Sequence, residues 1–192
     1  MPRLWTETID THRQQVRAAI VQSAARLVAE RGLTSVTMSQ VAEAAGIGRA
    51  TLYKYFPDVE AILTAWHGDQ VEAHLGELTR LAARAGDPGS SLDAVLAAYA
   101  HICAHRGRHG AKLNALLHHG PGLAHAQQQL VGLFRDLIER AAQAGIVRTD
   151  ISADELATYC VHALTAASAL ASKAAVGRLI EVTTTGLRPT GS

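Results

Sequence analysis

Apolar positions recur along this chain with the period of a helix rather than that of a strand. Between residues 13 and 31, Val16, Ile20, Leu27 and Val28 fall on one face of a helix. No stretch alternates apolar and polar residues over the length that a half-buried strand requires. The pattern therefore predicts an all-α protein whose first long helix covers residues 13–31 and ends at Gly32.

The same period predicts further helices in the rest of the chain, over residues 58–86, 91–105, 112–118, 125–144, 153–171 and 174–185. Asp58 is the expected N-cap of the first of these helices. Ser152 followed three residues later by Glu155 forms a capping box before residue 153. We expect Gly107 and Gly110 to break the helical structure between residues 105 and 112.

Residues 34–57 contain the signals of two short helices joined by a tight turn. Thr37 followed by Gln40 is a second capping box and starts the first short helix. Gly46 supplies the left-handed residue that ends this helix, and Ile47 places an apolar side chain in the turn. Such a helix-turn-helix is typical of DNA-binding proteins.

The second short helix is expected from Arg49 to Phe56. Leu52 and Phe56 are four residues apart and should both point inward, while Pro57 stops the helix. The remaining side chains are hydrogen-bond donors without an acid among them: Arg49, Thr51, Tyr53, Lys54 and Tyr55. A helix in the major groove needs donors toward phosphates and base edges. The alternative is an amphipathic helix whose polar face only meets water.

The segment IGRATLYKYFP, preceded by VTMSQVAEAAG, resembles the N-terminal signature of TetR-type (tetracycline repressor-like) transcriptional regulators. The resemblance is specific over residues 13–66 and only architectural beyond them. It implies an all-α homodimer, with a helix-turn-helix DNA-binding domain over 1–57 and an effector-binding and dimerisation domain over 58–192. The implied function is a one-component, ligand-responsive regulator, expected to be a repressor, that binds a palindromic operator.

Carried over residue by residue, the resemblance assigns DNA binding to Thr37, Met38, Gly48, Arg49, Ala50, Thr51, Tyr53, Lys54 and Tyr55. Two positions depart from the family's pattern. Gly48 stands where Ser or Thr usually caps the second short helix, and Val59 stands where a Lys commonly contacts phosphate. Near the start of the first long helix, Arg13 and Arg17 are either further phosphate contacts or solvated surface arginines.

The balance of basic and acidic residues bears on whether DNA binding is specific or non-specific. The net charge is +1, and residues 1–66 hold seven basic side chains (Arg3, Arg13, Arg17, Arg26, Arg31, Arg49, Lys54) against six acids (Glu7, Asp10, Glu30, Glu43, Asp58, Glu60). Non-specific binders depend on a large excess of positive charge. A structural module that only bridges DNA is therefore disfavoured, and binding should depend on a few well-placed donors.

Composition places the chain among cytoplasmic helical proteins. Hydrophobic residues make up 48% of the 192 residues and aromatic residues only 4%, which suits helices that meet through small side chains. No apolar leader and no run approaching the ~18 residues of a membrane span is present. Cys103 and Cys160 lack metal or redox spacing, and no phosphate loop, dinucleotide turn or nucleophile elbow suggests an enzyme or a cofactor.

The effector is expected in a mostly apolar pocket of the second domain with a few polar groups. The candidate lining residues are Tyr99, His101, Cys103, Asn114, Phe134, Tyr159 and His162. The sequence identifies neither this small molecule nor the operator. His101 and His105 have the i, i+4 spacing of a metal-chelating pair, but they lack the accompanying acid of a catalytic zinc site. A metal-sensing site and a set of polar tips in a pocket or on the surface remain as alternatives, and no metal ligands are assigned.

The last two predicted helices are rich in small and apolar side chains, which indicates packing against a second copy of the chain. A dimeric four-helix bundle from residues 153–186 of two subunits is the expected arrangement. The interface candidates are Ala163, Ala167, Leu170, Val176, Leu179 and Ile180.

Overall fold

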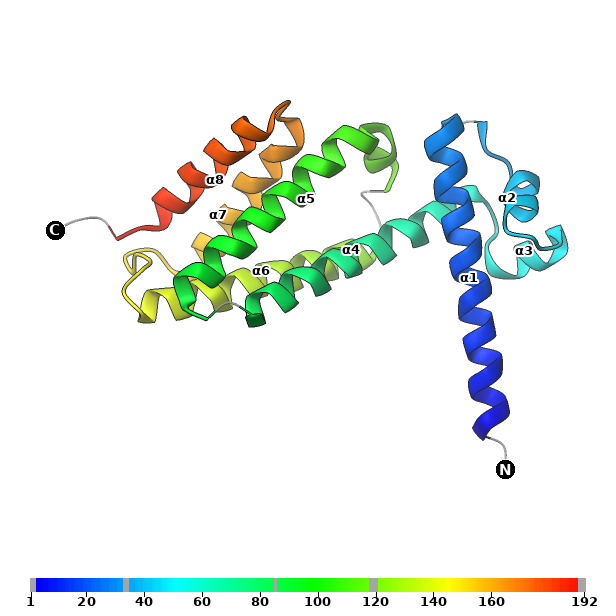
Figure 1. The fold of residues 1–192 in the computed structure, drawn as a ribbon, viewed down its shortest axis with the longest axis horizontal. Coiled ribbons are helices and arrows are strands. Elements are labelled where there is room, and N and C mark those ends of the chain that lie inside the picture. The colour runs from blue at the N-terminus through cyan, green and yellow to red at the C-terminus, as the bar shows by residue number, and fades with distance from the viewer. Residues whose placement is uncertain (1–2, 33–34, 85, 118–120, 190–192) are drawn as a thin grey trace. The chain divides into compact units, whose positions relative to one another are not determined.

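The computed structural model describes residues 3–32, 35–84, 86–117 and 121–189, with side chains for residues 11–32, 35–84, 86–106 and 124–189. In these residues the secondary structure is entirely helical, with eight α-helices and one 3₁₀-helix (Figure 1). The all-α class predicted from the hydrophobic period is confirmed. The chain divides into two compact units, residues 1–70 and 71–192. No helix in the described ranges is long and apolar enough to span a membrane.

The first unit contains three helices and the beginning of a fourth: α1 (Arg3–Arg31), α2 (Met38–Ala44), α3 (Arg49–Tyr55) and the start of α4 (Val59–Arg84). α1 begins ten residues before the predicted start at residue 13. It ends as predicted, because Gly32 takes the left-handed conformation with a φ of 81°. The core of this unit consists of Ile20, Val21, Ala24, Leu27, Val36, Val41, Ala42, Leu52, Phe56 and Ile62.

The first unit includes the opening turns of α4. Asp58 caps this helix as predicted, since its Oδ1 accepts a hydrogen bond of 2.7 Å from the backbone N–H of Ala61. Ile62 is fully buried in the core of the first unit, and Trp66 packs against it. This packing explains why the compact unit extends to residue 70, beyond the boundary at residue 57 that the sequence suggested.

The second unit consists of the rest of α4 with α5 (Pro88–Leu117), α6 (Pro121–Gln143), α7 (Ala153–Thr165), a 3₁₀-helix η2 (Ala166–Ala169) and α8 (Lys173–Leu187). α5 packs against α6, α7, η2 and α8 and is the central element of the unit (Figure 1). The core is mostly aliphatic, and its largest buried side chain is that of Phe134.

The predicted break at Gly107 and Gly110 is wrong. α5 continues through both glycines to Leu117, so the predicted helices 91–105 and 112–118 are one element. Glycine weakens a helix by only about 1 kcal/mol relative to alanine and keeps both backbone hydrogen-bonding groups. In a helix of 30 residues, two glycines do not stop propagation.

The prediction of one helix over residues 153–171 is also wrong. α7 ends at Thr165, and the chain continues through η2 to Leu170, whose backbone is extended at φ −87° and ψ 131°. The side-chain hydroxyl of Ser168 donates to the Thr165 carbonyl at 2.8 Å, and such local bonds compete with helix continuation. Ser172 then caps α8, its hydroxyl accepting from the N–H of Ala175 at 3.2 Å.

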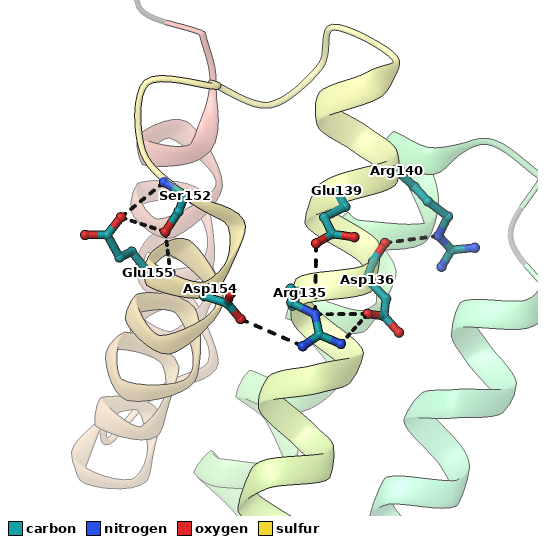
Figure 2. A network of polar contacts seen from close by, with 7 residues as sticks. All are labelled: Arg135, Asp136, Glu139, Arg140, Ser152, Asp154 and Glu155. Atoms are coloured by element: carbon teal, nitrogen blue, oxygen red, sulfur yellow. Dashed lines mark hydrogen bonds and ion pairs between the residues drawn. The ribbon is translucent and has the colours of Figure 1, made fainter.

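One ion pair joins α6 to α7, beside polar contacts within α6 and at the start of α7 (Figure 2). Arg135 contacts Asp136 at 3.0 Å, Glu139 at 4.0 Å and, on α7, Asp154 at 3.9 Å. Beside it, Ser152 and Glu155 form the predicted capping box. Exposed ion pairs of this kind contribute ~1 kcal/mol or less each, so the apolar core accounts for most of the stability of this unit.

Candidate functional site

The turn between α2 and α3 follows from the residues around Gly46. The Thr37 hydroxyl accepts from the Gln40 N–H at 3.4 Å, and the Gln40 side chain accepts from the Thr37 N–H at 2.9 Å, which confirms the predicted capping box. At the other end, the Gly46 N–H donates to Glu43 and the Ile47 N–H to Ala42, at 3.1 and 3.0 Å. These two bonds form a Schellman motif, which the positive φ of Gly46 (68°) makes possible.

α3 is anchored by its apolar side. Leu52 has no exposed surface, and Phe56 is buried at the C-cap, so both predicted inward positions are confirmed. Phe56 has the extended backbone (φ −142°, ψ 134°) expected before Pro57. The N-cap is Gly48, which offers no side-chain hydrogen bond. Packing therefore fixes the rotation of α3 about its axis without help from a side-chain cap.

The opposite side of α3 is open to solvent. Arg49, Ala50, Thr51 and Lys54 are exposed, and the Tyr53 side chain is 49% exposed. No other side chain in the described part of the chain forms a hydrogen bond or ion pair with Arg49, Thr51, Tyr53 or Lys54. Exposed donors on a packed helix, without competing partners, are what contact with a DNA groove requires.

Three other predicted DNA contacts have structural roles as well. Tyr55 is half-buried and Met38 is half-buried, and both pack against the core of the first unit. The Thr37 hydroxyl is engaged with Gln40 in the capping box. Gly48 is exposed at the start of α3. The assignment of all nine residues to DNA contact stays a prediction.

Arg17 has partners within the first unit. Its guanidinium contacts the Asp69 carboxylate at 3.1 Å, and it lies 5.9 Å from the centre of the Phe56 ring. Both contacts favour its present position. Of the two arginines that the sequence left open, Arg13 is exposed and Arg17 connects α1 to α4 and to the end of α3.

The second unit contains a cavity of about 300 Å³, between α4, α5, α6 and α7. Seven of its thirteen lining residues are aliphatic and six carry polar groups: Val71, His74, Leu75, Leu78, Tyr99, Ile102, Arg106, Ala126, Gln127, Leu130, Val161, His162 and Thr165. A cavity that combines apolar walls with several polar groups is typical of small-molecule sites.

Two hydroxyl groups form a fixed pair in this cavity. The Thr165 hydroxyl donates to the Val161 carbonyl at 2.7 Å. Its oxygen is therefore the acceptor for the Tyr99 hydroxyl, which lies 3.4 Å away. Burial raises the pKa of Tyr99 to about 12, so the phenol stays protonated and can donate at neutral pH.

Arg106 and His74 form a second pair of polar residues in the lining. The Arg106 guanidinium donates a hydrogen bond to Nδ1 of His74 over 3.3 Å, which requires the imidazole nitrogen to accept. Burial is the main cause that lowers the pKa of His74, and the positive charge of Arg106 lowers it further. His74 is therefore neutral at pH 7, and the charge of this pair belongs to Arg106.

The predicted pocket residues differ in whether they line the cavity, are buried in the core or are exposed to solvent. Tyr99 and His162 line the cavity. Phe134 is fully buried, with its ring edge-to-face against Tyr99 at 5.7 Å, and Cys103 is buried as well. His101 and Tyr159 are exposed and do not line the cavity, because their positions on α5 and α7 face solvent. The side chain of Asn114 lies outside the described residues.

Sequence reasoning missed His74, Arg106 and Thr165. A signal existed for the first two. His74 lies three residues after Val71 and four before Leu78, and Arg106 lies four residues after Ile102, so both continue apolar helical stripes. A polar side chain on such a stripe faces the interior, where it needs a partner or a ligand.

The cysteines and histidines do not form a metal-binding cluster in the described part of the chain, which contains no group of three or more potential ligands. Cys103 and Cys160 are buried free thiols, and burial raises the pKa of both. Their low reactivity at neutral pH follows from this shift.

The six predicted interface residues differ in burial within their own chain. Ala167 and Val176 are buried in the core of their own chain, and the assignment of the six residues to an interface stays a prediction. Ala163, Leu170, Leu179 and Ile180 are half-buried. Nearby apolar surface is provided by Val182 on α8 (64% exposed) and by Tyr159 on α7.

This geometry defines a helix-turn-helix protein with a second helical unit that contains a small-molecule-sized cavity. Two family matches agree with it: residues 20–65 match "Bacterial regulatory proteins, tetR family", and residues 87–189 match "Transcriptional regulator SbtR-like, C-terminal domain". The chain belongs to the TetR family of transcriptional regulators. It is therefore a DNA-binding regulator and not an enzyme.

The chain is also similar to individual regulators in sequence and in fold. An uncharacterised HTH-type transcriptional regulator of Mycobacterium tuberculosis strain H37Rv is 40% identical over 62 residues, which cover 32% of this chain and 31% of that protein. The match thus spans about a third of that relative's length. A TetR/AcrR-family regulator from Thermobifida fusca shares the fold with a TM-score of 0.77 and 18% identity, covering 90% of this chain and 98% of that chain. The TetR regulator SCO0520 from Streptomyces coelicolor has a TM-score of 0.63 and 25% identity, covering 91% and 99%.

Proposed function

We propose that this protein is a ligand-responsive repressor that binds a palindromic operator as a homodimer in the cytoplasm. The observation that carries the proposal is the solvent-facing side of α3, where Arg49, Thr51, Tyr53 and Lys54 have no side-chain partner in the described residues. The fully buried Leu52 fixes the rotation of the helix that carries these donors. The near-neutral charge of the chain supports recognition by placement rather than by bulk attraction.

Dimerisation is supported by the apolar surface on α7 and α8. Val182 and Tyr159 are exposed, and Leu179 and Ile180 are half-buried beside the core. The Tyr159 hydroxyl would lie 3.7 Å from a Cβ placed at Gly186, so the tyrosine lies over the C-terminal part of α8. We define Tyr159, Leu179, Ile180 and Val182 as the α7–α8 patch. A two-fold interface made from this patch would pair the α3 helices of two subunits, which are the expected recognition helices, as a palindrome requires.

The response to a ligand is supported by α4. This helix contributes Ile62 to the core of the first unit and Leu78 to the core of the second. It also contributes Val71, His74 and Leu75 to the cavity lining. A ligand that changes the preferred position of α4 would alter the spacing of the two recognition helices, which B-form DNA accepts only near one helical turn, ~34 Å.

The proposal is tested by a gel shift with the DNA upstream of the protein's own gene against a shuffled duplex of the same composition. Binding that is tighter to the upstream DNA by a factor of about 10³ is expected of a specific regulator. Equal binding of the two duplexes would instead support a module that only bridges DNA.

A further inference from the structure

The cavity of the second unit contains a guanidinium without a carboxylate partner. Arg106 is partly buried, and its described contact is with the neutral imidazole of His74 at 3.3 Å. Glu77 acts on His74 electrostatically, whereas the hydrogen bond of Arg106 in the described residues is to His74. The following segment, residues 107–123, contains no Asp or Glu. Arg106 therefore has no paired carboxylate among the described residues.

Other arginines of the same unit show the contrast. Arg135 contacts the Asp136 carboxylate at 3.0 Å, and Arg148 contacts Asp150 at 2.6 Å. The Arg135 side chain is exposed and that of Arg148 is half-buried, and each of these two guanidinium groups has a carboxylate partner. Arg106 is half-buried and lines the cavity, and a charge that is partly removed from water without a counter-ion is costly. An anionic group in the cavity would remove that cost.

The rest of the cavity fits an apolar molecule of moderate size. Leu75, Leu78 and Leu130 contribute to the walls, and no acid lines the cavity in the described part of the chain. The volume of about 300 Å³ corresponds to roughly ten water-sized groups. A cationic ligand would be repelled by Arg106, and a neutral one would leave its charge unbalanced.

We propose that the cavity binds an amphipathic carboxylic acid of on the order of ten non-hydrogen atoms, with its carboxylate on Arg106 and its apolar part among the leucines. The guanidinium presents a planar set of donors that matches a carboxylate. This inference rests on the proposed function only for the ligand's effect on DNA, because binding to the cavity is measured without DNA.

The test uses the full-length protein and three straight-chain probes: decanoate, decanol and decylamine. Calorimetry should show decanoate binding at least tenfold more tightly than decanol, and decylamine more weakly than either. In Arg106→Gln, decanoate affinity should fall at least tenfold while decanol affinity stays the same. Arg106→Lys keeps the charge but loses the planar donor pair and should lie between the two.

Two further variants locate the site. Leu75→Trp should fill the cavity and weaken decanoate and decanol together. Arg84→Gln, at the exposed end of α4 and outside the cavity lining, should leave both affinities unchanged. Thermal unfolding of each ligand-free variant shows that the fold is retained. The proposal is overturned if decanoate binds Arg106→Gln as it binds the wild type, if decanol binds as tightly as decanoate, or if no carboxylate binds.

Decanoate is then added to the complex with upstream DNA. Release of the DNA by decanoate in the wild type but not in Arg106→Gln supports the ligand response. Carboxylate binding that depends on Arg106 without any effect on DNA binding would overturn the ligand response and leave the ligand class in place. The two failures are therefore distinguishable.

Discussion

Arg106 on α5 donates a hydrogen bond to Nδ1 of His74 on α4 over 3.3 Å, and this contact joins two walls of the cavity. It needs a neutral imidazole, because a proton on Nδ1 would remove the acceptor and place two positive groups together. Burial and Arg106 lower the pKa of His74 below 6.5, with a smaller lowering from His105, while Glu77 raises it in part. The pair is thus sensitive to acid.

The first prediction is the pH dependence of stability. Below pH 6.5, the unfolded chain takes up a proton at residue 74 before the folded chain does, so the free energy of unfolding falls as the pH drops through this range. His74→Gln keeps an acceptor without titrating. Urea unfolding between pH 7.5 and 5.5 should show a smaller loss for His74→Gln than for the wild type. If the free energy of unfolding falls equally with pH in both proteins, His74 does not contribute to the loss of stability in acid.

The second prediction concerns phosphate contact by α3. Lys54 is exposed in the last turn of α3. If it contacts phosphate, Lys54→Ala removes one contact from each subunit of the proposed dimer and should reduce the slope of log affinity against log salt by about two units. Lys173→Ala, at the start of α8, removes the same charge far along the sequence and should leave the slope unchanged. Fluorescence anisotropy with upstream DNA measures both, and an unchanged slope for Lys54→Ala would rule out the contact.

The third prediction separates the two glycines of the helix-turn-helix. Gly46 has a φ of 68°, so Gly46→Ala should reduce the free energy of unfolding by about 1 kcal/mol although space for a Cβ is available. Gly48 has an ordinary φ of −71° at the N-cap of α3. Gly48→Ser should stabilise the protein by a few tenths of a kcal/mol through capping. Equal effects of the two changes would contradict the assigned conformations.

The helix-turn-helix and most helices could be predicted from the hydrophobic period and from the residues that start and stop helices. Thr37 with Gln40, Gly46 and Pro57 act on their nearest neighbours, so the helix-turn-helix follows from local chemistry. The break predicted at Gly107 and Gly110 was wrong because helix continuation there does not depend on the nearest residues alone. A long helix continues through a weak position when its neighbours stabilise it. Local sequence carries little information about that balance.

The cavity was harder to predict than the turn. Tyr99 and His162 were expected there, but His74 and Arg106 come from helices α4 and α5, which are distant in sequence. Their contact depends on how two helices pack, which no single segment encodes. Ala167 shows the same limit: its small side chain suggested an interface, whereas the break at Leu170 folds it into its own core.

The fourth prediction concerns the α7–α8 patch. Val182→Glu places a charge on its most exposed residue and should shift the protein toward monomers. Ala83→Glu adds the same charge at an exposed position of α4 and should leave the assembly unchanged. Sedimentation velocity measures both variants. A stable dimer of Val182→Glu would place the interface elsewhere.

The central claim is that the cavity and the operator are coupled, and it is tested by titrating a cavity ligand with and without operator DNA. A ligand that prefers the DNA-free state ~100-fold shifts the equilibrium by about 2.7 kcal/mol, within the usual range of allosteric coupling. Because coupling is reciprocal, operator DNA should weaken ligand binding by the same factor that ligand weakens DNA binding. Calorimetry of the protein alone and of the protein–operator complex measures this factor directly. Equal ligand affinities in the two titrations would contradict the account and leave a DNA-binding protein with an unconnected cavity.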